Sequence, residues 1–353
     1  MFDTLPLSLL VLFFVGAATA VWLAGIRLSD ATDALAQRFG LGEVLGGMIL
    51  LAVVTNLPEI AITVSAALHH RLGIAVGNIL GGIALQTVVL VVLDVVGLGK
   101  AAPLTYRVAS LELVLEGVLV MAILALVVMG HQFPTSLTIL RMAPVDLLIA
   151  VLWVGGIYLV SRSRNALPWQ PAGAVADGQQ DEGKTSRQRS KRATRQGVST
   201  TRSIVVFLVG AVVTLIGGVI LEQTGGILAD RIGMSGVLFG ATVLAAATSL
   251  PEVSTGLAAV KLGDYQLAFS DILGGNAFLP VLFLLATLLS GQAVLPMAQK
   301  TDIYLTGLSM LLTAVYIYGL LFRPRRQIAR MGIDSLLVLL LYVLGIIGLF
   351  FIV

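Results

Sequence analysis

Two five-residue stretches decide the fold of this chain: Thr55-Asn56-Leu57-Pro58-Glu59 and Thr248-Ser249-Leu250-Pro251-Glu252. The second stretch lies 193 residues after the first, and the same offset aligns further residues without a gap. It places Arg38 on Arg231, Gly40 on Gly233, Gly47 on Gly240, Asn78 on Asp271, and Ile79-Leu80-Gly81-Gly82 on Ile272-Leu273-Gly274-Gly275. A match this regular indicates an internal duplication, which decides the architecture of a chain.

The composition indicates a membrane protein. Of the 353 residues, 58% are hydrophobic and 12% charged, whereas a soluble domain carries roughly a quarter charged residues. Ten apolar runs are long enough to cross a hydrocarbon core, which takes about 20 residues. They are 5–26, 44–68, 73–97, 108–130, 143–161, 203–222, 235–260, 265–291, 302–322 and 333–353. Because the runs are continuous rather than alternating, we expect an all-α polytopic membrane protein with about ten transmembrane helices.

The runs divide into two blocks of five. Five is an odd number, so the second copy must enter the membrane from the side opposite to the first, which predicts two inverted five-helix repeats. We expect repeats at 1–160 and 203–353, separated by a linker at 161–202. The linker is rich in Arg, Lys, Ser, Gln and Gly and lacks apolar periodicity, which is typical of disorder. Inverted repeats with broken helices are an architecture of secondary transporters.

Basic residues predict the orientation, because cytoplasmic loops retain lysine and arginine during insertion. With the linker in the cytoplasm, 18 of the 22 lysines and arginines fall on that side. We therefore expect a multi-pass protein of a cell membrane, of prokaryotic type, with both termini outside the cytoplasm. The basic residues lie in loops rather than on a folded face, so nucleic acid is not an expected partner. The sequence does not indicate an oligomeric state.

A glutamate directly follows a proline inside the second and the seventh runs. Proline in mid-helix removes a backbone donor and clashes with the preceding turn, so both helices should be broken there. An ionisable side chain near the middle of an apolar span is by default a functional candidate. The matched pair Glu59 and Glu252 is therefore expected to be functional. Asp94 and Asp146 lie toward span ends, where water should reach them, and we expect surface or cap roles for both.

Oxygen atoms accompany this pair, and oxygen is the ligand that hard cations such as Ca²⁺ prefer. The glutamates would supply negative charge, and the residues before each proline would supply hydroxyl, amide or backbone oxygen. The third and eighth runs would add further ligands. The expected cation ligands are Glu59, Glu252, Thr55, Asn56, Thr248, Ser249, Asp271, Asn78 and Gln86.

Exchange is the expected activity of such a site. Two carboxylates facing each other in a poorly hydrated place favour neutralisation, so cation binding and protonation should compete, and a neutralised site changes sides at low electrostatic cost. The sequence lacks the Gly-rich Lys-Ser/Thr loop of nucleotide hydrolases and the His-Glu-x-x-His helix of metalloproteases, and it contains no cysteine. We expect a transporter rather than an enzyme, with no cofactor apart from transported Ca²⁺, Na⁺ or H⁺.

The paired motifs resemble those of the sodium/calcium exchanger superfamily, in which each of two inverted five-helix halves carries a Gly-Thr-Ser-Leu-Pro-Glu signature. The corresponding stretches here are 54–59 and 247–252, and the resemblance is continuous over 40–98 and 233–288. The ten-run layout extends it to the whole chain. It implies a calcium:cation antiporter in which the two glutamates are the central ion ligands and the residues before each proline are their companions.

The chain departs from this signature in its third and eighth runs. Typical calcium-selective members continue there as Gly-Ser-Asn-Ile-Phe followed by Asn or Asp. This chain has Gly82 and Gly275 at the serine positions, Gln86 at one amide position and apolar Leu279 at the other. Asp271 supplies a carboxylate where family members usually carry Asn. It either replaces the lost charge or lies outside the ligand shell and binds protons.

Three functions remain open at this point. The first is exchange of Ca²⁺ for Na⁺ or H⁺ by alternating access at the paired glutamates. The second is Na⁺/H⁺ exchange without calcium transport, which the thinned ligand set favours because Na⁺ needs fewer oxygens and less charge. The third is a non-transporting protein that keeps a degenerate exchanger fold, and the retention of both glutamates argues against it.

Overall fold

The computed structural model describes residues 2–39, 50–98, 102–108, 110–136, 142–166 and 200–352, and most of them are helical. The first half contains α1 (Leu7–Arg38), α2 (Leu51–Thr55), α3 (Leu57–Leu68), α4 (Leu72–Val92), the π-helical turn η2 (Leu93–Leu98), α5 (Leu104–Val108), α6 (Leu111–Gly130) and α7 (Pro144–Ala166). The second half contains α9 (Thr200–Ile232), α10 (Gly236–Phe239), η3 (Gly240–Leu244), α11 (Ala245–Thr248), α12 (Leu250–Lys261), α13 (Tyr265–Phe278), η4 (Leu279–Val281), α14 (Leu282–Ser290), η5 (Leu295–Met297), α15 (Lys300–Phe322) and α16 (Ile333–Ile352). A short antiparallel hairpin of β1 (Gln327–Ile328) and β2 (Met331–Gly332) precedes α16.

Eight helices of the described ranges are long and apolar enough to cross a membrane, and a bent pair raises the number to nine. The bent pair joins Gly236–Thr248 to Leu250–Lys261 at 41°. The matching segment of the first half, α2 and α3, is described only from residue 50, and its apolar helix Leu57–Leu68 is shorter than a span. Helical segments occur at each of the ten predicted runs, so the prediction of an all-helical membrane protein is confirmed.

Two helices extend well beyond the runs that predicted them. α1 has 32 residues and α9 has 33, because both continue into polar sequence that a hydropathy criterion leaves out of a span. Two hydroxyls along them bond within their own helix: the Thr32 hydroxyl donates to the carbonyl of Leu28 at 2.8 Å, and the Thr224 hydroxyl to that of Ile220 at 2.6 Å. α1 packs along α9, so the two long helices also support each other.

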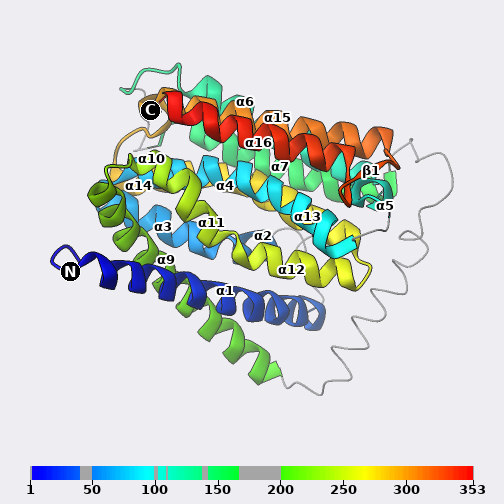
Figure 1. The fold of residues 1–353 in the computed structure, drawn as a ribbon, viewed down its shortest axis with the longest axis horizontal. Helices are drawn as coiled ribbons and strands as arrows, with labels where there is room; N and C mark the ends of the chain where they lie inside the picture. The colour runs from blue at the N-terminus through cyan, green and yellow to red at the C-terminus, as the bar shows by residue number, and fades with distance from the viewer. Residues whose placement is uncertain are drawn as a thin grey trace.

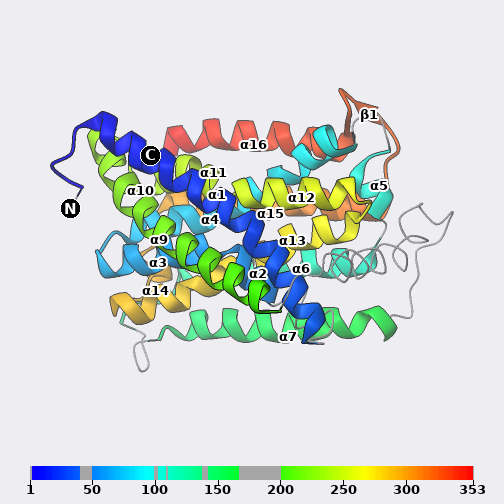
Figure 2. The same ribbon diagram turned by 90° about the horizontal axis from the view of Figure 1, so that it is seen from below.

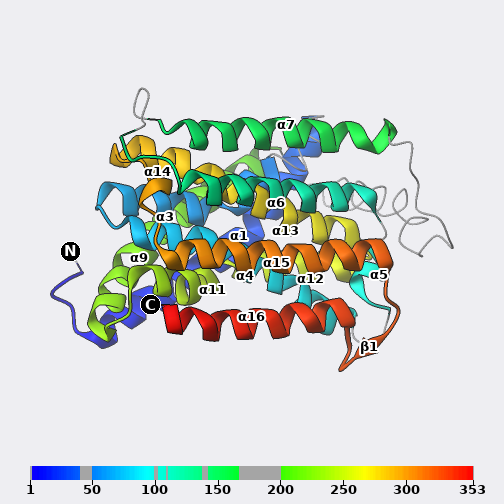
Figure 3. The same ribbon diagram turned by 90° about the horizontal axis from the view of Figure 1, so that it is seen from above.

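The arrangement of the helices fits an inverted duplication. Both chain termini lie at one end of the bundle, and α9 runs back toward that end while α1 runs away from it (Figure 1). α7 and α16, the last helices of the two halves, lie on opposite outer sides with the other helices between them (Figures 2 and 3). α4 and α13 are the most buried spans, whereas α1, α9 and α16 expose many large apolar side chains, as expected for helices that face lipid.

Glycines let the central helix α4 approach the bent helix closely. A Cβ atom at Gly81 would lie 2.7 Å from the carbonyl oxygen of Ala241, and one at Gly77 would lie 2.8 Å from the Cα of Val237. These obstacles are backbone atoms of α10 and η3, which cannot move aside as a flexible side chain can. The contact therefore fixes the position of α4 against the broken helix of the other half.

Candidate cation-binding site

The two halves break their helices at the same place in the repeat. α2 ends at Thr55 and α3 begins at Leu57, and in the other half α11 ends at Thr248 and α12 begins at Leu250. A proline occupies the first turn of each continuing helix. Since proline has no N–H group to donate to the previous turn, the chain bends there and frees polar backbone groups.

The residues between the helix pieces bind that freed backbone in the same way. The Asn56 amide donates to the carbonyl of Ala52 at 2.7 Å, and the Ser249 hydroxyl donates to the repeat-related carbonyl of Ala245 at 2.8 Å. Thr248 also points its hydroxyl at Ala245, at 3.2 Å. Each of these hydroxyls donates its hydrogen to a backbone carbonyl, which leaves the lone pairs of its oxygen unused. A cation binds to such lone pairs.

Glu59 and Glu252 follow directly and are buried, with 1% and 3% of their surfaces exposed. None of their four carboxylate oxygens has a hydrogen-bond partner within the described part of the chain. Glu59 lies beside Thr248 of the other half, and Glu252 lies close enough to Glu59 and Asp271 for their charges to repel. The site therefore gathers negative charge from both halves without a compensating protein cation among those residues.

Two further expected ligands meet at Gly275 of α13. A Cβ atom there would lie 3.2 Å from the Asn56 amide nitrogen and 3.4 Å from the Gln86 side-chain oxygen. The missing side chain thus leaves space that the two amides share. Asp271 lies one turn earlier on the same helix, where the Thr255 hydroxyl donates to its carboxylate at 3.4 Å.

Asn78 is the expected ligand with the least connection to the glutamates. Its side chain is fully buried, and neither its oxygen nor its nitrogen has a hydrogen-bond partner in the described ranges. Its backbone contacts the region of Gly240, where a Cβ atom would lie 2.9 Å from the Asn78 nitrogen. The structure therefore places Glu59, Thr248, Glu252 and Asp271 together and brings Asn56 to Gln86, whereas the described neighbour of Asn78 is η3.

Sequence reasoning missed one buried amide, Asn276. It is fully buried on α13, and its amide donates to the Thr87 hydroxyl of α4 at 3.1 Å, while its oxygen has no partner among the described residues. The repeat offset pairs Asn276 with apolar Ile83, so the comparison of the two halves does not select it. A polar amide directly after Gly274-Gly275 in an apolar run was the available signal.

The expectation that water reaches Asp94 and Asp146 is wrong, because both are fully buried. Asp146 accepts a hydrogen bond from the Thr287 hydroxyl at 2.6 Å. Asp94 accepts from the backbone N–H of Leu104, the first residue of α5, at 2.9 Å, and this bond is a helix cap. Neighbouring segments fold over the ends of these spans. The sequence of a span does not show which other segments cover its ends.

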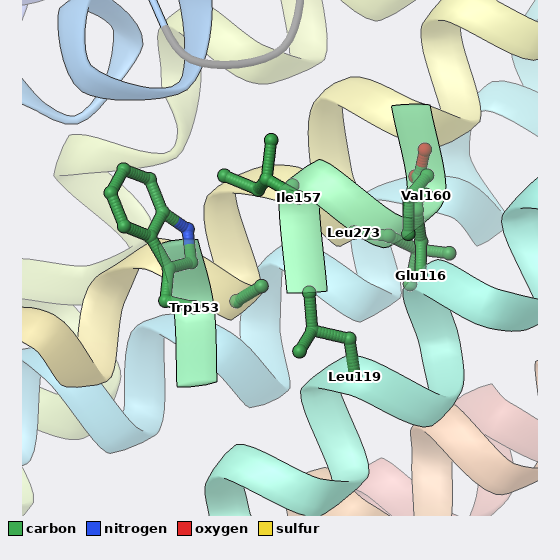
Figure 4. Close-up of a pocket in the computed structure, with 8 residues that line it drawn as sticks. Glu116, Leu119, Trp153, Ile157, Val160 and Leu273 are labelled. Atoms are coloured by element: carbon green, nitrogen blue, oxygen red, sulfur yellow. The ribbon is translucent and has the colours of Figure 1, made fainter. Parts of the chain in front are cut away.

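A small cavity lies on another side of α13, between that helix, α6 and α7 (Figure 4). Trp153, Ile157 and Val160 line it from α7, and Leu119 and Glu116 from α6. The Ser270 hydroxyl donates to Glu116 at 2.9 Å. None of the expected cation ligands lines this mainly apolar cavity, so it is separate from the paired glutamates.

Comparison with known proteins agrees with this architecture. The chain is 27% identical to inner membrane protein YrbG of Escherichia coli K12 over 330 residues, which covers 92% of each chain. It is 24% identical to the putative antiporter CaxA of Alkalimonas amylolytica over 273 residues, or 76% of each chain.

Solved structures share the fold. The crystal structure of the H⁺/Ca²⁺ exchanger CAX superposes with a TM-score of 0.64 at 14% identity, covering 97% of this chain and 82% of that chain. The sodium-calcium exchanger NCX_Mj superposes with a TM-score of 0.61 at 16% identity, covering 96% and 98%. The family described as sodium/calcium exchanger protein matches residues 8–161 and 202–351. With both halves of the chain matched, this protein belongs to the sodium/calcium exchanger family and is a transporter.

Proposed function

We propose that the protein is a secondary active antiporter that exchanges Ca²⁺ for Na⁺ or H⁺ by alternating access at Glu59 and Glu252. One observation carries the proposal: four carboxylate oxygens from two halves of a membrane bundle are buried without hydrogen-bond partners in the described residues. An isolated buried charge is very costly in a medium of low dielectric. A bound cation or protons must therefore neutralise the pair.

The proposed ligand shell extends beyond the glutamates. Hydroxyl and amide oxygens at the two kinks, together with polar side chains of α4 and α13, supply the six to eight oxygens that Ca²⁺ takes. The full proposed set is Glu59, Glu252, Thr55, Asn56, Thr248, Ser249, Asp271, Asn78 and Gln86. Because the kinks belong to different halves, movement of one half relative to the other changes the side from which the ligands are reached.

Proteins with similar folds support both coupling ions. One solved relative is described as an H⁺/Ca²⁺ exchanger and another as a sodium-calcium exchanger. Either ion suits a site built on two carboxylates, because protonation and Na⁺ binding both remove net charge. Exchange then follows from competition: the site carries Ca²⁺ in one direction and its competitor in the other.

A second candidate, Na⁺/H⁺ exchange without Ca²⁺ transport, is favoured by Leu279. This side chain is fully buried, and its Cδ1 atom lies 3.6 Å from where a Cβ atom at Gly82 would be. Both positions carry oxygen ligands in typical calcium-selective members of the superfamily. Their replacement by an apolar contact removes oxygens from that side of the site, and Na⁺ tolerates this loss better than Ca²⁺.

Transport into proteoliposomes tests the proposal. Purified protein is reconstituted, and Ca²⁺ uptake is followed under an outward Na⁺ gradient and, separately, under an outward H⁺ gradient. Glu59→Gln and Glu252→Gln remove the proposed charges. Glu116→Gln is the matched control, because Glu116 is also a buried glutamate but lines the separate cavity between α6, α7 and α13.

The expected result is Ca²⁺ entry under at least one gradient, loss of entry in both site variants, and entry retained in the control. Na⁺/H⁺ exchange without Ca²⁺ movement would replace the first candidate by the second. If correctly folded protein moves neither Ca²⁺ nor Na⁺ nor H⁺, antiport at these glutamates is refuted.

We also propose that residues 1–160 and 203–353 are the two repeats and that the linker 161–202 lies in the cytoplasm with both termini outside it. Support comes from the excess of lysine and arginine assigned to one side. The chain contains no cysteine, so single cysteines introduced by Asp3→Cys and Ser186→Cys can be probed cleanly. An impermeant thiol reagent added to intact cells should label the first and not the second; the reverse pattern would overturn the orientation.

A further inference from the structure

Two aspartates are buried together at the end of the bundle that carries the β1–β2 hairpin. Asp94 lies in η2, at the end of α4, and Asp334 lies in the first turn of α16. They are 0% and 6% exposed. Figure 3 shows the hairpin, the start of α16 and α5 gathered at this end of the molecule, opposite to the chain termini.

The two carboxylates converge on Gly332. The backbone N–H of Gly332 donates to Asp94 Oδ2 at 2.7 Å. A Cβ atom at Gly332 would collide with Asp334 Oδ1 and would lie 3.4 Å from Asp94 Oδ2. Oxygens from both acids therefore flank the same point, and the electrostatic influence of Asp94 on Asp334 is repulsive.

Asp334 is the member of the pair whose carboxylate charge is not balanced by hydrogen bonds. Neither of its carboxylate oxygens has a hydrogen-bond partner in the described ranges, although the Thr105 hydroxyl lies beside it. That hydroxyl is itself buried and has no partner there. No lysine, arginine or histidine whose side chain the structure describes lies within 4.0 Å of either aspartate. The two carboxylates thus lie close together with the Thr105 hydroxyl beside Asp334, and no basic side chain that the structure describes neutralises the two acids.

The other half of the repeat solves the equivalent problem differently. The offset of 193 places Asp94 on Thr287. Thr287 donates its hydroxyl to Asp146, in the first turn of α7, at 2.6 Å, and α7 is the last helix of its half, as α16 is of the other. At that end a hydroxyl donates to one oxygen of the acid, whereas at this end a second carboxylate stands in place of that hydroxyl. The second negative charge points to a ligand that the first half does not need.

We propose that Asp94 and Asp334 bind a divalent cation of the Ca²⁺ class at a site separate from the paired glutamates. Two carboxylates match a charge of +2, and the Thr105 hydroxyl adds a neutral oxygen. The hydroxyls of Ser335 and Tyr316 lie next to the pair, 3.4 Å from each other. Oxygen ligands of this kind are what Ca²⁺ selects.

Occupation of this site joins four segments. Asp94 already holds α5 through the N–H of Leu104 and the hairpin through the N–H of Gly332. A cation between the aspartates adds α16 to this assembly and removes the repulsion at its first turn. A ligand that binds the folded state but not the unfolded state raises stability by mass action. A cation at this site therefore stabilises the contact between the end of α4 and the start of α16.

The test uses full-length protein with Glu59→Gln and Glu252→Gln, which removes the charges of the proposed transport site. Thermal unfolding and Ca²⁺ binding by calorimetry are measured with and without Ca²⁺, with Mg²⁺ and Na⁺ for comparison. We expect Ca²⁺ to raise Tm by several degrees and to bind with one site per chain. Adding Asp94→Asn or Asp334→Asn should abolish both the shift and the binding.

Asp94→Thr is the variant that keeps the result decisive, because it copies the hydroxyl–carboxylate pair of Thr287 and Asp146. We expect it to fold without Ca²⁺, with Tm at least as high as that of the cation-free parent, and to show no Ca²⁺ response. A Ca²⁺ shift that persists in Asp94→Thr, or the absence of any shift in the parent, would overturn the proposal. Failure of transport in the wild type would leave this outcome unaffected, because the test reads Ca²⁺ binding and Tm rather than transport.

Discussion

Gly81 and Gly274 occupy matching positions of the repeat, yet the structure predicts opposite responses to the same substitution. At Gly81 a Cβ atom would lie 2.7 Å from the carbonyl oxygen of Ala241, and at Gly274 it would meet nothing within 4 Å. Overpacking costs about 1–3 kcal/mol, and the upper part of that range applies at Gly81 because the obstacle is backbone. Alanine recovers about 1 kcal/mol over glycine within a helix.

The net loss for Gly81→Ala is then about 2 kcal/mol, which for a chain of 353 residues corresponds to a fall in Tm of roughly 3 °C, because the shift per kcal/mol shrinks as the chain grows. Gly274→Ala should leave Tm unchanged or raise it by about 1 °C, since only the helix preference changes. Tryptophan fluorescence of detergent-solubilised protein during heating measures both. Equal Tm values for the two variants, or a larger fall for Gly274→Ala, would refute the close packing of α4 on the bent helix.

Three further predictions follow from buried polar contacts and from the charge of the site. Asn276→Ala removes the donor to Thr87 and should cost about 1–3 kcal/mol; an unchanged Tm would contradict the contact. Thr287→Val strips Asp146 of its hydroxyl donor and should cost a similar amount, whereas Thr287→Ser should retain most stability; equal losses would exclude the hydrogen bond as the cause. Ca²⁺ affinity, measured by calorimetry, should weaken as pH falls because a protonated glutamate carries no charge for the cation, and pH-independent affinity would argue against binding at the glutamates.

Most of the fold could be predicted because its signals are local. A span is recognised by a continuous apolar run, and a broken helix by proline within it, so residues around Pro58 and Pro251 predicted the discontinuity between α2 and α3 and between α11 and α12. The lengths of α1 and α9 could not be predicted in this way. Their last turns are polar, and they remain helical because each helix packs against the other.

The burial of polar side chains near the ends of spans, or with partners far away in the sequence, could not be predicted from the sequence. The pattern around Glu59 and Glu252 was informative because both lie in mid-span, where no exposure to water is expected. Asp94 lies at the end of a span, and its burial depends on α5 and the hairpin folding over it. Asn276 escaped notice for a related reason: its partner Thr87 is distant in sequence, and only tertiary structure brings them together.

Gly82 and Leu279 differ from the signature of the superfamily on two neighbouring helices, and the structure shows that the two positions are in contact. The Cδ1 atom of Leu279 lies 3.6 Å from where the side chain of residue 82 would begin. A hydroxyl at 82 would therefore face a methyl group, and an acid at 279 would face bare backbone. Each change alone leaves a polar group without its partner, so the two departures are expected to depend on each other energetically.

A double-mutant cycle measures that dependence, because contacting residues couple by about 0.5–3 kcal/mol whereas independent ones add. Leu279→Asp alone should lower stability, since it places a carboxylate in a fully buried position. Adding Gly82→Ser supplies a hydroxyl donor and a further oxygen, so the double variant should recover stability and bind Ca²⁺ more tightly than either single variant. Strictly additive effects on Tm and on Ca²⁺ affinity would show that the two positions do not share one place in the site and that their contact does not weaken Ca²⁺ binding.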